Sequence, residues 1–268
     1  MSETFWLGLL LKIAMTASIV VAASVVVERS GPFIGALIAA LPTAGGAAYI
    51  ILAIEHPPAF IAQSTVGSLV SNAVCLFFAL AFAVLAQKRS LLVSLGGAYL
   101  LWFCLAAATR FVEWTMPLAA ALNVVAYPVT IWAGTQFRAE GARNKVKNTV
   151  YDIAWRAAVV TACVVAVTAA SSSIGSFWSG IFAFFPVAMG SFFLILYLRV
   201  GGPTAASVAA HVQVPLIGLG LGLVAVHYLA EPAGVWRSYL ACLSISLGWN
   251  ALLWFARNRR RALAAPQN

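Results

Sequence analysis

The sequence has very little charge. Only 9% of its 268 residues are charged and only seven are acidic, whereas 63% are hydrophobic. A soluble domain carries about 25% charged residues, so this chain lacks the polar groups needed to cover a surface that faces water. The composition therefore excludes an ordinary soluble globular protein and predicts an integral membrane protein.

The sequence also lacks the residue patterns of the common catalytic and metal sites. It contains no HExxH motif, no phosphate loop and no Ser/His/Asp set with a useful spacing. All its cysteines lie inside apolar runs without a CxxC spacing, so we interpret them as reduced packing residues; they are Cys75, Cys104, Cys163 and Cys242. We therefore expect no enzymatic activity, no bound metal and no cofactor.

Long apolar runs recur from one end of the chain to the other. A transmembrane helix needs about 20 such residues. The runs predict an all-α polytopic membrane protein with nine transmembrane helices, at about residues 5–27, 33–54, 59–86, 91–109, 114–134, 157–174, 177–198, 204–229 and 235–256. The lipid bilayer is thus the one partner that the composition itself predicts.

The basic residues lie in the short gaps between these runs. With nine spans and the C-terminus in the cytoplasm, 13 of the 16 Lys and Arg residues fall on the cytoplasmic side, as the positive-inside rule requires. No predicted helix carries a continuous face of basic side chains that could bind phosphates. The net charge of +9 therefore indicates the orientation of the chain in the membrane rather than a nucleic-acid partner. We expect a multi-pass protein of the bacterial inner (plasma) membrane, with the N-terminus outside and the C-terminus inside.

Two proline-containing segments indicate an internal repeat. "ALIAALPTAGG" holds Pro42 and "GIFAFFPVAMG" holds Pro186, 144 residues later. At this offset the chain aligns without gaps over about 50 residues, and Gly31 meets Gly175 while Gly46 meets Gly190. The repeat divides the chain into a first copy with an extra fifth span (1–136), a basic cytoplasmic linker (137–156) and a second copy with a basic tail (157–268).

The matched spans lie five apart, so they cross the membrane in opposite directions. Spans 1–4 and 6–9 are therefore expected to form an inverted-topology repeat, an arrangement found in many secondary transporters. Pro42 lies about ten residues into its span, or roughly 15 Å at 1.5 Å per residue, which is half of a ~30 Å hydrocarbon core. Two hypotheses stay open for the prolines: broken helices that line a central site, or kinks needed only for packing.

Polar side chains also occur within the spans. In 59–86, Ser64, Ser68, Ser71, Asn72 and Cys75 share one helix face, and Ser207 and His211 share a face in 204–229. Asn123 and Tyr127 share a face in 114–134. Interhelical hydrogen bonding and the lining of a solute pathway are equal alternatives for the polar groups of 59–86 and 204–229. The candidate substrate-binding residues are Pro42, Thr43, Gly46, Ser68, Asn72, Pro186, Gly190, Ser207, His211 and Gln213.

Residues 33–86 resemble the core of the small GlpM-like inner-membrane proteins. The stretch Leu41-Pro42-Thr43 matches the apolar-Leu-Pro-Thr pattern of that family, and Phe185-Pro186-Val187 matches it less well because Thr is replaced. The resemblance implies a fused, duplicated relative of these proteins. It implies no substrate and no site residues.

Two functional hypotheses follow. The first is an inner-membrane transporter or permease for a small solute, with its site near the midplane at the proline-broken helices. The alternative is a non-transport scaffold or assembly subunit of a larger envelope complex. The sequence does not name the solute, which could be a small molecule or an ion, and it leaves a homo-oligomer open.

Overall fold

The described part of the chain is entirely helical. The computed structural model describes residues 43–138 and 150–264, and every regular element in these ranges is a helix. The α-helices are α3 (Thr43–Glu55), α4 (Pro58–Leu85), α5 (Leu91–Ala108), α6 (Met116–Gly134), α7 (Val150–Ala183), α8 (Val187–Val200), α9 (Gly202–Val212), α10 (Leu216–Leu229) and α11 (Val235–Ala264). Two single 3₁₀ turns, η1 (Thr109–Phe111) and η2 (Thr135–Phe137), follow α5 and α6.

Six segments in these ranges are long and apolar enough to cross a membrane. They are Pro58–Leu85, Leu91–Phe111, Met116–Phe137, Ser173–Leu198, Gly202–Leu229 and Val235–Arg259. A helical multi-pass membrane protein is therefore confirmed. The predicted first span and the first part of the second lie outside the described residues, so the number nine stays a prediction.

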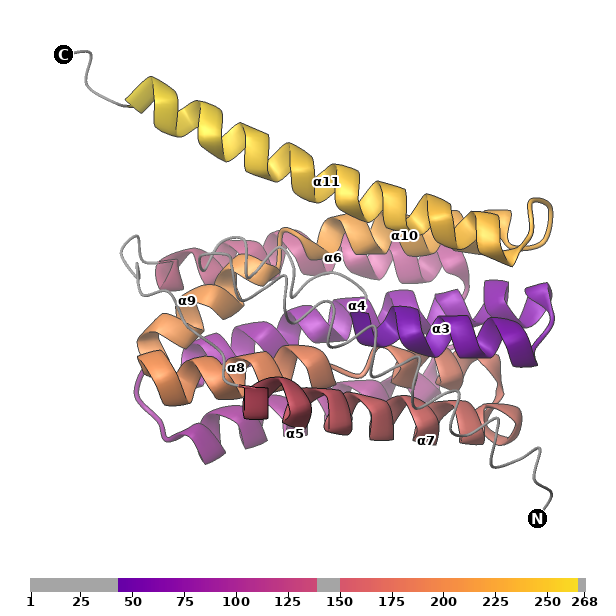
Figure 1. Ribbon diagram of the computed structural model, residues 1–268, viewed down its shortest axis with the longest axis horizontal. Helices are drawn as coiled ribbons and strands as arrows, with labels where there is room; N and C mark the ends of the chain where they lie inside the picture. The colour runs from indigo at the N-terminus through magenta and orange to yellow at the C-terminus, as the bar shows by residue number, and fades with distance from the viewer. Residues whose placement is uncertain (1–42, 139–149, 265–268) are drawn as a thin grey trace.

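Neighbouring helices run back and forth along one axis, so the bundle has two ends (Figure 1). The turns after Glu55 and Leu229 lie at one end, where His227 Nδ1 lies 2.7 Å from the carbonyl oxygen of Ala62. The turns after Leu85 and Val200 lie at the other end, where the Tyr197 hydroxyl donates to the Arg89 carbonyl at 2.7 Å.

Charge separates between these two ends. The end with the Leu85 and Val200 turns, called the basic end below, carries Lys88, Arg89, Arg138 and the arginines at the end of α11. The opposite end carries all three carboxylates whose side chains the structure describes, Glu55, Glu113 and Glu231, together with Arg110 and Arg237. We call it the acidic end. The uneven distribution of basic residues along the sequence thus corresponds to a difference in charge between the two ends of the folded bundle.

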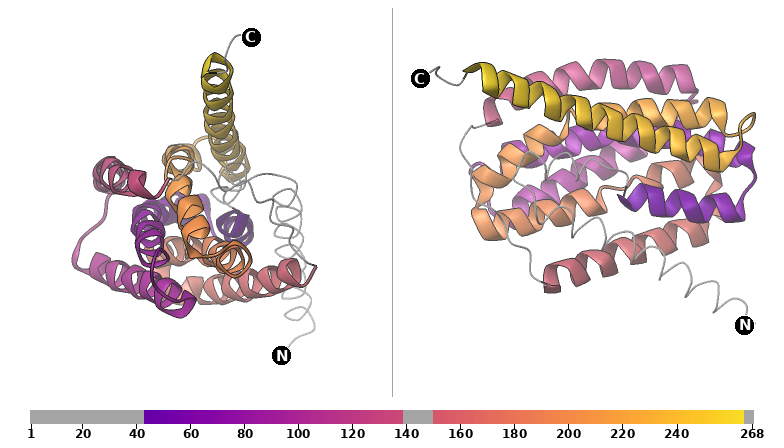
Figure 2. Two further views of the ribbon diagram at one scale, coloured as in Figure 1. Left: turned by 90° about the vertical axis from the view of Figure 1, so that its left-hand side faces the viewer. Right: turned by 45° about the horizontal axis from the view of Figure 1, so that its top comes forward.

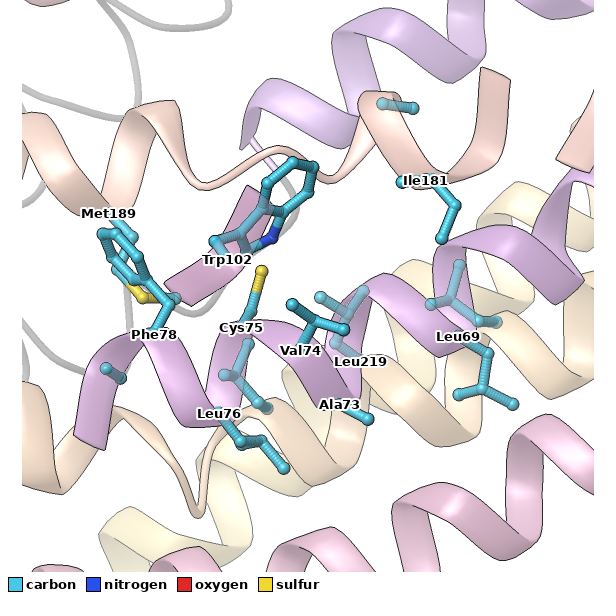
Figure 3. Packing of buried hydrophobic residues seen from close by; sticks show 14 of the residues in the cluster. Leu69, Ala73, Val74, Cys75, Leu76, Phe78, Trp102, Ile181, Met189 and Leu219 are labelled. Atoms are coloured by element: carbon cyan, nitrogen blue, oxygen red, sulfur yellow. The ribbon is translucent and has the colours of Figure 1, made fainter. Parts of the chain in front are cut away.

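Helix α4 lies at the centre of the bundle and packs on α3, α5, α6, α7, α9 and α10. Phe78, Phe82 and Leu76 of α4 are fully buried, and Trp102 of α5 and Ile181 of α7 lie against the same core (Figure 3). Helices α5, α6 and α11 lie at the periphery (Figure 2) and expose large apolar side chains, among them Leu92, Leu100, Val124, Leu240 and Leu252. Such a surface suits lipid, where apolar exposure carries no penalty.

Helical order is interrupted at three places inside the apolar segments. Gly175 separates two parts of α7 with a φ of 78°, a conformation that glycine adopts without steric cost, and it falls in the predicted gap between the sixth and seventh spans. A second interruption separates α7 from α8 at Phe184–Pro186, so the predicted break at Pro186 is present. Pro42, its predicted counterpart, lies outside the described residues.

The third interruption was not predicted. The expected eighth span divides into α9 and α10, with Gln213, Val214 and Pro215 between them. Proline at 215 cannot donate the backbone hydrogen bond that would continue α9 into α10. Within the range predicted as a cytoplasmic linker, 137–156, η2 includes Phe137 and α7 begins at Val150.

Element boundaries recur at the offset seen in the sequence. Helix α4 covers 58–85 and the α9–α10 pair covers 202–229, which are the same bounds shifted by 144 residues. Helices α5 and α11 begin 144 residues apart, at Leu91 and Val235. Helix α4 runs from the acidic end to the basic end, whereas the α9–α10 pair runs the other way (Figure 1).

Candidate functional site

The polar face of α4 is fully inside the bundle. Its five residues, Ser64, Ser68, Ser71, Asn72 and Cys75, are at most 5% exposed. Ser68 Oγ donates to the Gly180 carbonyl of α7 at 2.9 Å and lies 2.7 Å from the Tyr49 hydroxyl of α3. The serines of this face therefore join α4 to α3 and α7 by hydrogen bonds, as the interhelical alternative described.

Two glycines allow α4 and the second part of α7 to approach this closely. A Cβ atom at Gly180 would overlap the carbonyl oxygen of Ser64, and one at Gly67 would overlap the carbonyl oxygen of Phe177. Each helix thus places a glycine against the backbone of the other. This contact sets the distance across which Ser68 reaches Gly180.

At the break before α8, neighbouring side chains hydrogen-bond to the backbone. The Phe184 carbonyl accepts from Ser71 Oγ and Cys75 Sγ, both at 3.4 Å, and the Pro186 carbonyl accepts from the Tyr99 hydroxyl at 3.3 Å. Gly190 has no side chain that would collide with the Tyr99 hydroxyl.

Aromatic rings pack around the same break. The Phe185 ring stacks on Tyr99 at 5.5 Å between centroids and meets Trp102 edge-on at 4.8 Å. Figure 3 shows the Cys75 sulfur directed toward Trp102 and Phe78 lying beside Met189 of α8. The break at Pro186 is therefore a packed, hydrogen-bonded interruption, with its polar groups turned toward protein.

Of the site residues predicted in the first repeat around Pro42, only Thr43 and Gly46 belong to α3 in the described part of the chain. Thr43 lies in α3, but its side chain is outside the described set. Gly46 is half-buried, and a Cβ atom there would meet nothing within 4 Å.

A second polar network links α4, α6 and α10. Asn72 Nδ2 donates to Asn123 Oδ1 at 3.0 Å and to the Tyr127 hydroxyl at 2.6 Å, and that hydroxyl donates to the Leu216 carbonyl at 2.6 Å. Asn123 Nδ2 donates to the Leu69 carbonyl at 2.8 Å. Sequence spacing had placed Asn123 and Tyr127 on one face, and the structure brings that face to Asn72 beside the first turn of α10.

The break between α9 and α10 holds a buried amide without partners. Gln213 has no exposed surface, and neither its Nε2 nor its Oε1 has a hydrogen-bond partner in the part of the chain described. Its Oε1 lies 2.8 Å from where a Cβ atom of Gly134 would stand, so the amide faces the end of α6. Nearby backbone is satisfied, because Trp249 Nε1 donates to the Val214 carbonyl at 2.9 Å.

Arg138 approaches the same break from the end of α6. Its Nε donates to the Ala210 carbonyl of α9 at 3.2 Å, while its Nη2 is buried and has no partner among the described residues. Burial lowers the pKa of the Arg138 guanidinium from its ordinary value. Sequence reasoning had assigned Arg138 to the linker, and only its contact with a residue 72 positions later reveals it.

His211 lies on α9 between these groups and is half-buried. Its Nδ1 is 2.7 Å from the Ser207 carbonyl, so Nδ1 carries the donating proton and Nε2 is left as an acceptor. Arg138 and Arg257 both act electrostatically on His211. The α9–α10 break is therefore polar and positively charged on the side that faces the basic end.

The predicted site residues therefore divide into two groups. Ser68, Pro186 and Gly190 belong to the packed break before α8. Asn72, Ser207, His211 and Gln213 belong to the surroundings of the α9–α10 break, called the α9–α10 site below. Across residues 43–138 and 150–264, no three His, Cys, Asp or Glu side chains are placed to hold a metal ion.

Comparison with protein-family models gives no match for this chain, and comparisons with curated proteins and with solved structures give none either.

Proposed function

We propose that the protein is a small multi-pass permease in which a solute passes by the α9–α10 site. The observation that carries this proposal is Gln213, a fully buried side chain whose two amide atoms have no partner within the described chain. It lies where an apolar segment of spanning length is interrupted. An unpaired buried amide costs about 1–3 kcal/mol, a cost that a bound solute or water would offset.

An inverted repeat is part of the proposal. The equal bounds of α4 and the α9–α10 pair, shifted by 144 residues, support it, as do their opposite directions along the bundle. In transporters built this way, sites form where discontinuous helices meet inside the membrane. Helix α10 begins in the bundle interior at Leu216, so it fits that description.

The proposed orientation places the basic end in the cytoplasm of the cell whose inner membrane holds the protein. Lys88, Arg89 and Arg138 lie at that end, and the described carboxylates Glu55 and Glu231 lie at the other. An excess of Lys and Arg in short loops sets orientation in this sense. In this orientation the solute reaches Arg138 from the cytoplasmic side.

A scaffold subunit is the second candidate, and one observation favours it. The break before α8, which the sequence marks most strongly, has its Phe184 and Pro186 carbonyls bonded to protein and aromatic rings around them. These contacts support a packing role for that break. The two candidates therefore differ in what they predict for the α9–α10 site, which is open to water in a permease and sealed in a scaffold.

Cysteine accessibility tests this difference without knowledge of the solute. The four native cysteines are replaced by alanine, and Gln213→Cys is introduced into the reconstituted protein. A small membrane-impermeant thiol reagent is expected to label Cys at 213 in sealed proteoliposomes, because a permease must admit water to its site. Ala79→Cys, at a position in α4 with no exposed surface, is the matched buried control and is expected to stay unlabelled.

Solute flux then tests the function directly. Uptake of a panel of small solutes into proteoliposomes is measured for the wild type and for His211→Ala, with His56→Ala at the acidic end as the control. Flux that His211→Ala reduces at least tenfold and His56→Ala leaves unchanged supports the permease. Labelling at 213 no faster than at 79, together with no flux, would instead favour the scaffold.

A further inference from the structure

Three side chains in and around the α9–α10 site have buried polar atoms that lack partners in the described chain: Asn72 (Oδ1), Arg138 (Nη2) and Gln213 (Oε1 and Nε2). The chemistry of Gln213 and Arg138 restricts what could bind. Gln213 presents one donor, Nε2, and one acceptor, Oε1, both buried and both unpartnered in the described chain. The oxygen and nitrogen of an amide are easily exchanged in assignment, but the requirement is the same either way. A ligand that satisfies Gln213 must both accept and donate a hydrogen bond.

Arg138 adds a requirement for negative charge. Its Nη2 is buried without a partner among the described residues, and the guanidinium stays protonated in proteins. The described carboxylates lie at the opposite end of the bundle, whereas Arg257 adds a second positive charge near His211. Arg138 is half-buried, and a partly desolvated cation is stabilised by an opposite charge, so an anion suits its unpartnered Nη2.

Both side chains lie where the end of α6 meets the end of α9. Gly134 lies beside Gln213, and Arg138 donates to the Ala210 carbonyl. The segment at the end of α6 therefore contacts the end of α9 at two places. Ala210 lies in the last turn of α9 and Gln213 directly follows its last residue, so their backbones are about 4.5 Å apart along the helix axis. A carboxylate or phosphate group bound at this junction would take one hydrogen bond from each side chain. The first turn of α10 begins three residues after Gln213, and helix N-termini favour anions.

We propose that the permease substrate is a small free solute with an oxyanion group and a hydroxyl group, bound between Arg138 and Gln213. Arg138 holds the oxyanion, Gln213 Nε2 donates to it, and Gln213 Oε1 accepts from the hydroxyl. Hydroxycarboxylates and hydrogen phosphate have this combination of groups, whereas acetate lacks the hydroxyl. The proposal names the solute class of the α9–α10 site and therefore rests on the transport function proposed above.

Binding measured by calorimetry tests the proposal apart from transport. The full chain is placed in nanodiscs of phosphatidylcholine, which has no net charge, and titrated with glycolate, inorganic phosphate and acetate. We expect glycolate and phosphate to bind saturably, and acetate to bind roughly tenfold more weakly for lack of the hydroxyl.

Two variants assign the roles of the side chains. Arg138→Gln is expected to lower the binding affinity for every oxyanion by roughly ten- to a hundredfold, because it removes a charge-assisted hydrogen bond. Gln213→Met keeps the side-chain volume and is expected to abolish the preference for glycolate over acetate. Arg237→Gln, an exposed arginine at the acidic end, is the matched control and is expected to bind like the wild type.

The outcomes separate the substrate class from the transport function. If neither glycolate nor phosphate binds saturably, but the protein transports a neutral solute, the oxyanion proposal is overturned and the permease proposal still holds. The expected binding pattern without flux of any solute supports the oxyanion site and contradicts transport. Stabilisation by phosphatidylglycerol without binding of either soluble anion also overturns the proposal, because the ligand would then be a lipid headgroup.

Discussion

Replacing Gly180 by alanine tests the contact that holds α4 against α7. A Cβ atom at this position would lie 2.8 Å from the carbonyl carbon of Ser64 and 2.9 Å from the amide nitrogen of Ser68, and would overlap the Ser64 oxygen. Ordinary contacts of this kind are 3.4–4 Å, and the atoms concerned are backbone, so the two helices must separate. The change also lengthens the 2.9 Å hydrogen bond from Ser68 Oγ to the Gly180 carbonyl.

The magnitude follows from these two losses. Overpacking of a tight interior costs about 1–3 kcal/mol. An interhelical hydrogen bond in a membrane protein contributes roughly 0.6–2 kcal/mol. We therefore expect Gly180→Ala to lower the free energy of unfolding by about 2–4 kcal/mol, measured by thermal or denaturant unfolding in detergent followed by circular dichroism.

Gly46→Ala is the matched control, because it is the same substitution in another helix with open space around it. A Cβ atom there meets nothing within 4 Å, so the free energy of unfolding is expected to change by no more than ~1 kcal/mol, the scale of helix propensity. The reasoning is refuted if Gly180→Ala unfolds like the wild type, or if both alanine variants lose stability equally.

Two further predictions concern the second polar network and the polarity of the bundle. Tyr127→Phe removes the hydroxyl that joins Asn72 to the Leu216 carbonyl, and is expected to cost about 1–3 kcal/mol of unfolding free energy in the same assay; an unchanged stability would mean that the network contributes nothing. In a cysteine-free background, Lys88→Cys is expected to react with an impermeant thiol reagent only from the cytoplasmic side and Arg237→Cys only from the opposite side. Labelling of both positions from one side would contradict the arrangement of the ends.

Several structural features could be predicted from the sequence because they depend on local chemistry. A bilayer-spanning helix must be apolar over most of its length, so hydropathy located α4, α5, α6 and the start of α11 closely. The serine face of α4 followed from helical periodicity alone. Gly175 and Pro186 mark interruptions because their backbones suit, respectively, a positive φ and a missing donor.

Other features depended on neighbours that the sequence does not identify. Pro128 lies inside α6, which continues through it, whereas α9 ends just before Pro215. The two prolines look alike in the sequence. At the α9–α10 break the Val214 carbonyl finds Trp249 as a donor, and such partners from other helices allow a broken helix inside a membrane.

The sequence by itself determined the class of the protein, the positions of most spans and the uneven distribution of charge, because each of these is a sum over local residue properties. Only the tertiary structure decided which polar residues are satisfied and which are not. Ser68 Oγ and Asn72 Nδ2 are hydrogen-bonded to neighbouring helices, although Asn72 Oδ1 is buried without a described partner. Neither amide atom of Gln213 has a described partner, and that amide faces the helix end that carries Arg138. That difference depends on which helix ends meet, and contacts between residues 72 positions apart are not encoded in any local pattern.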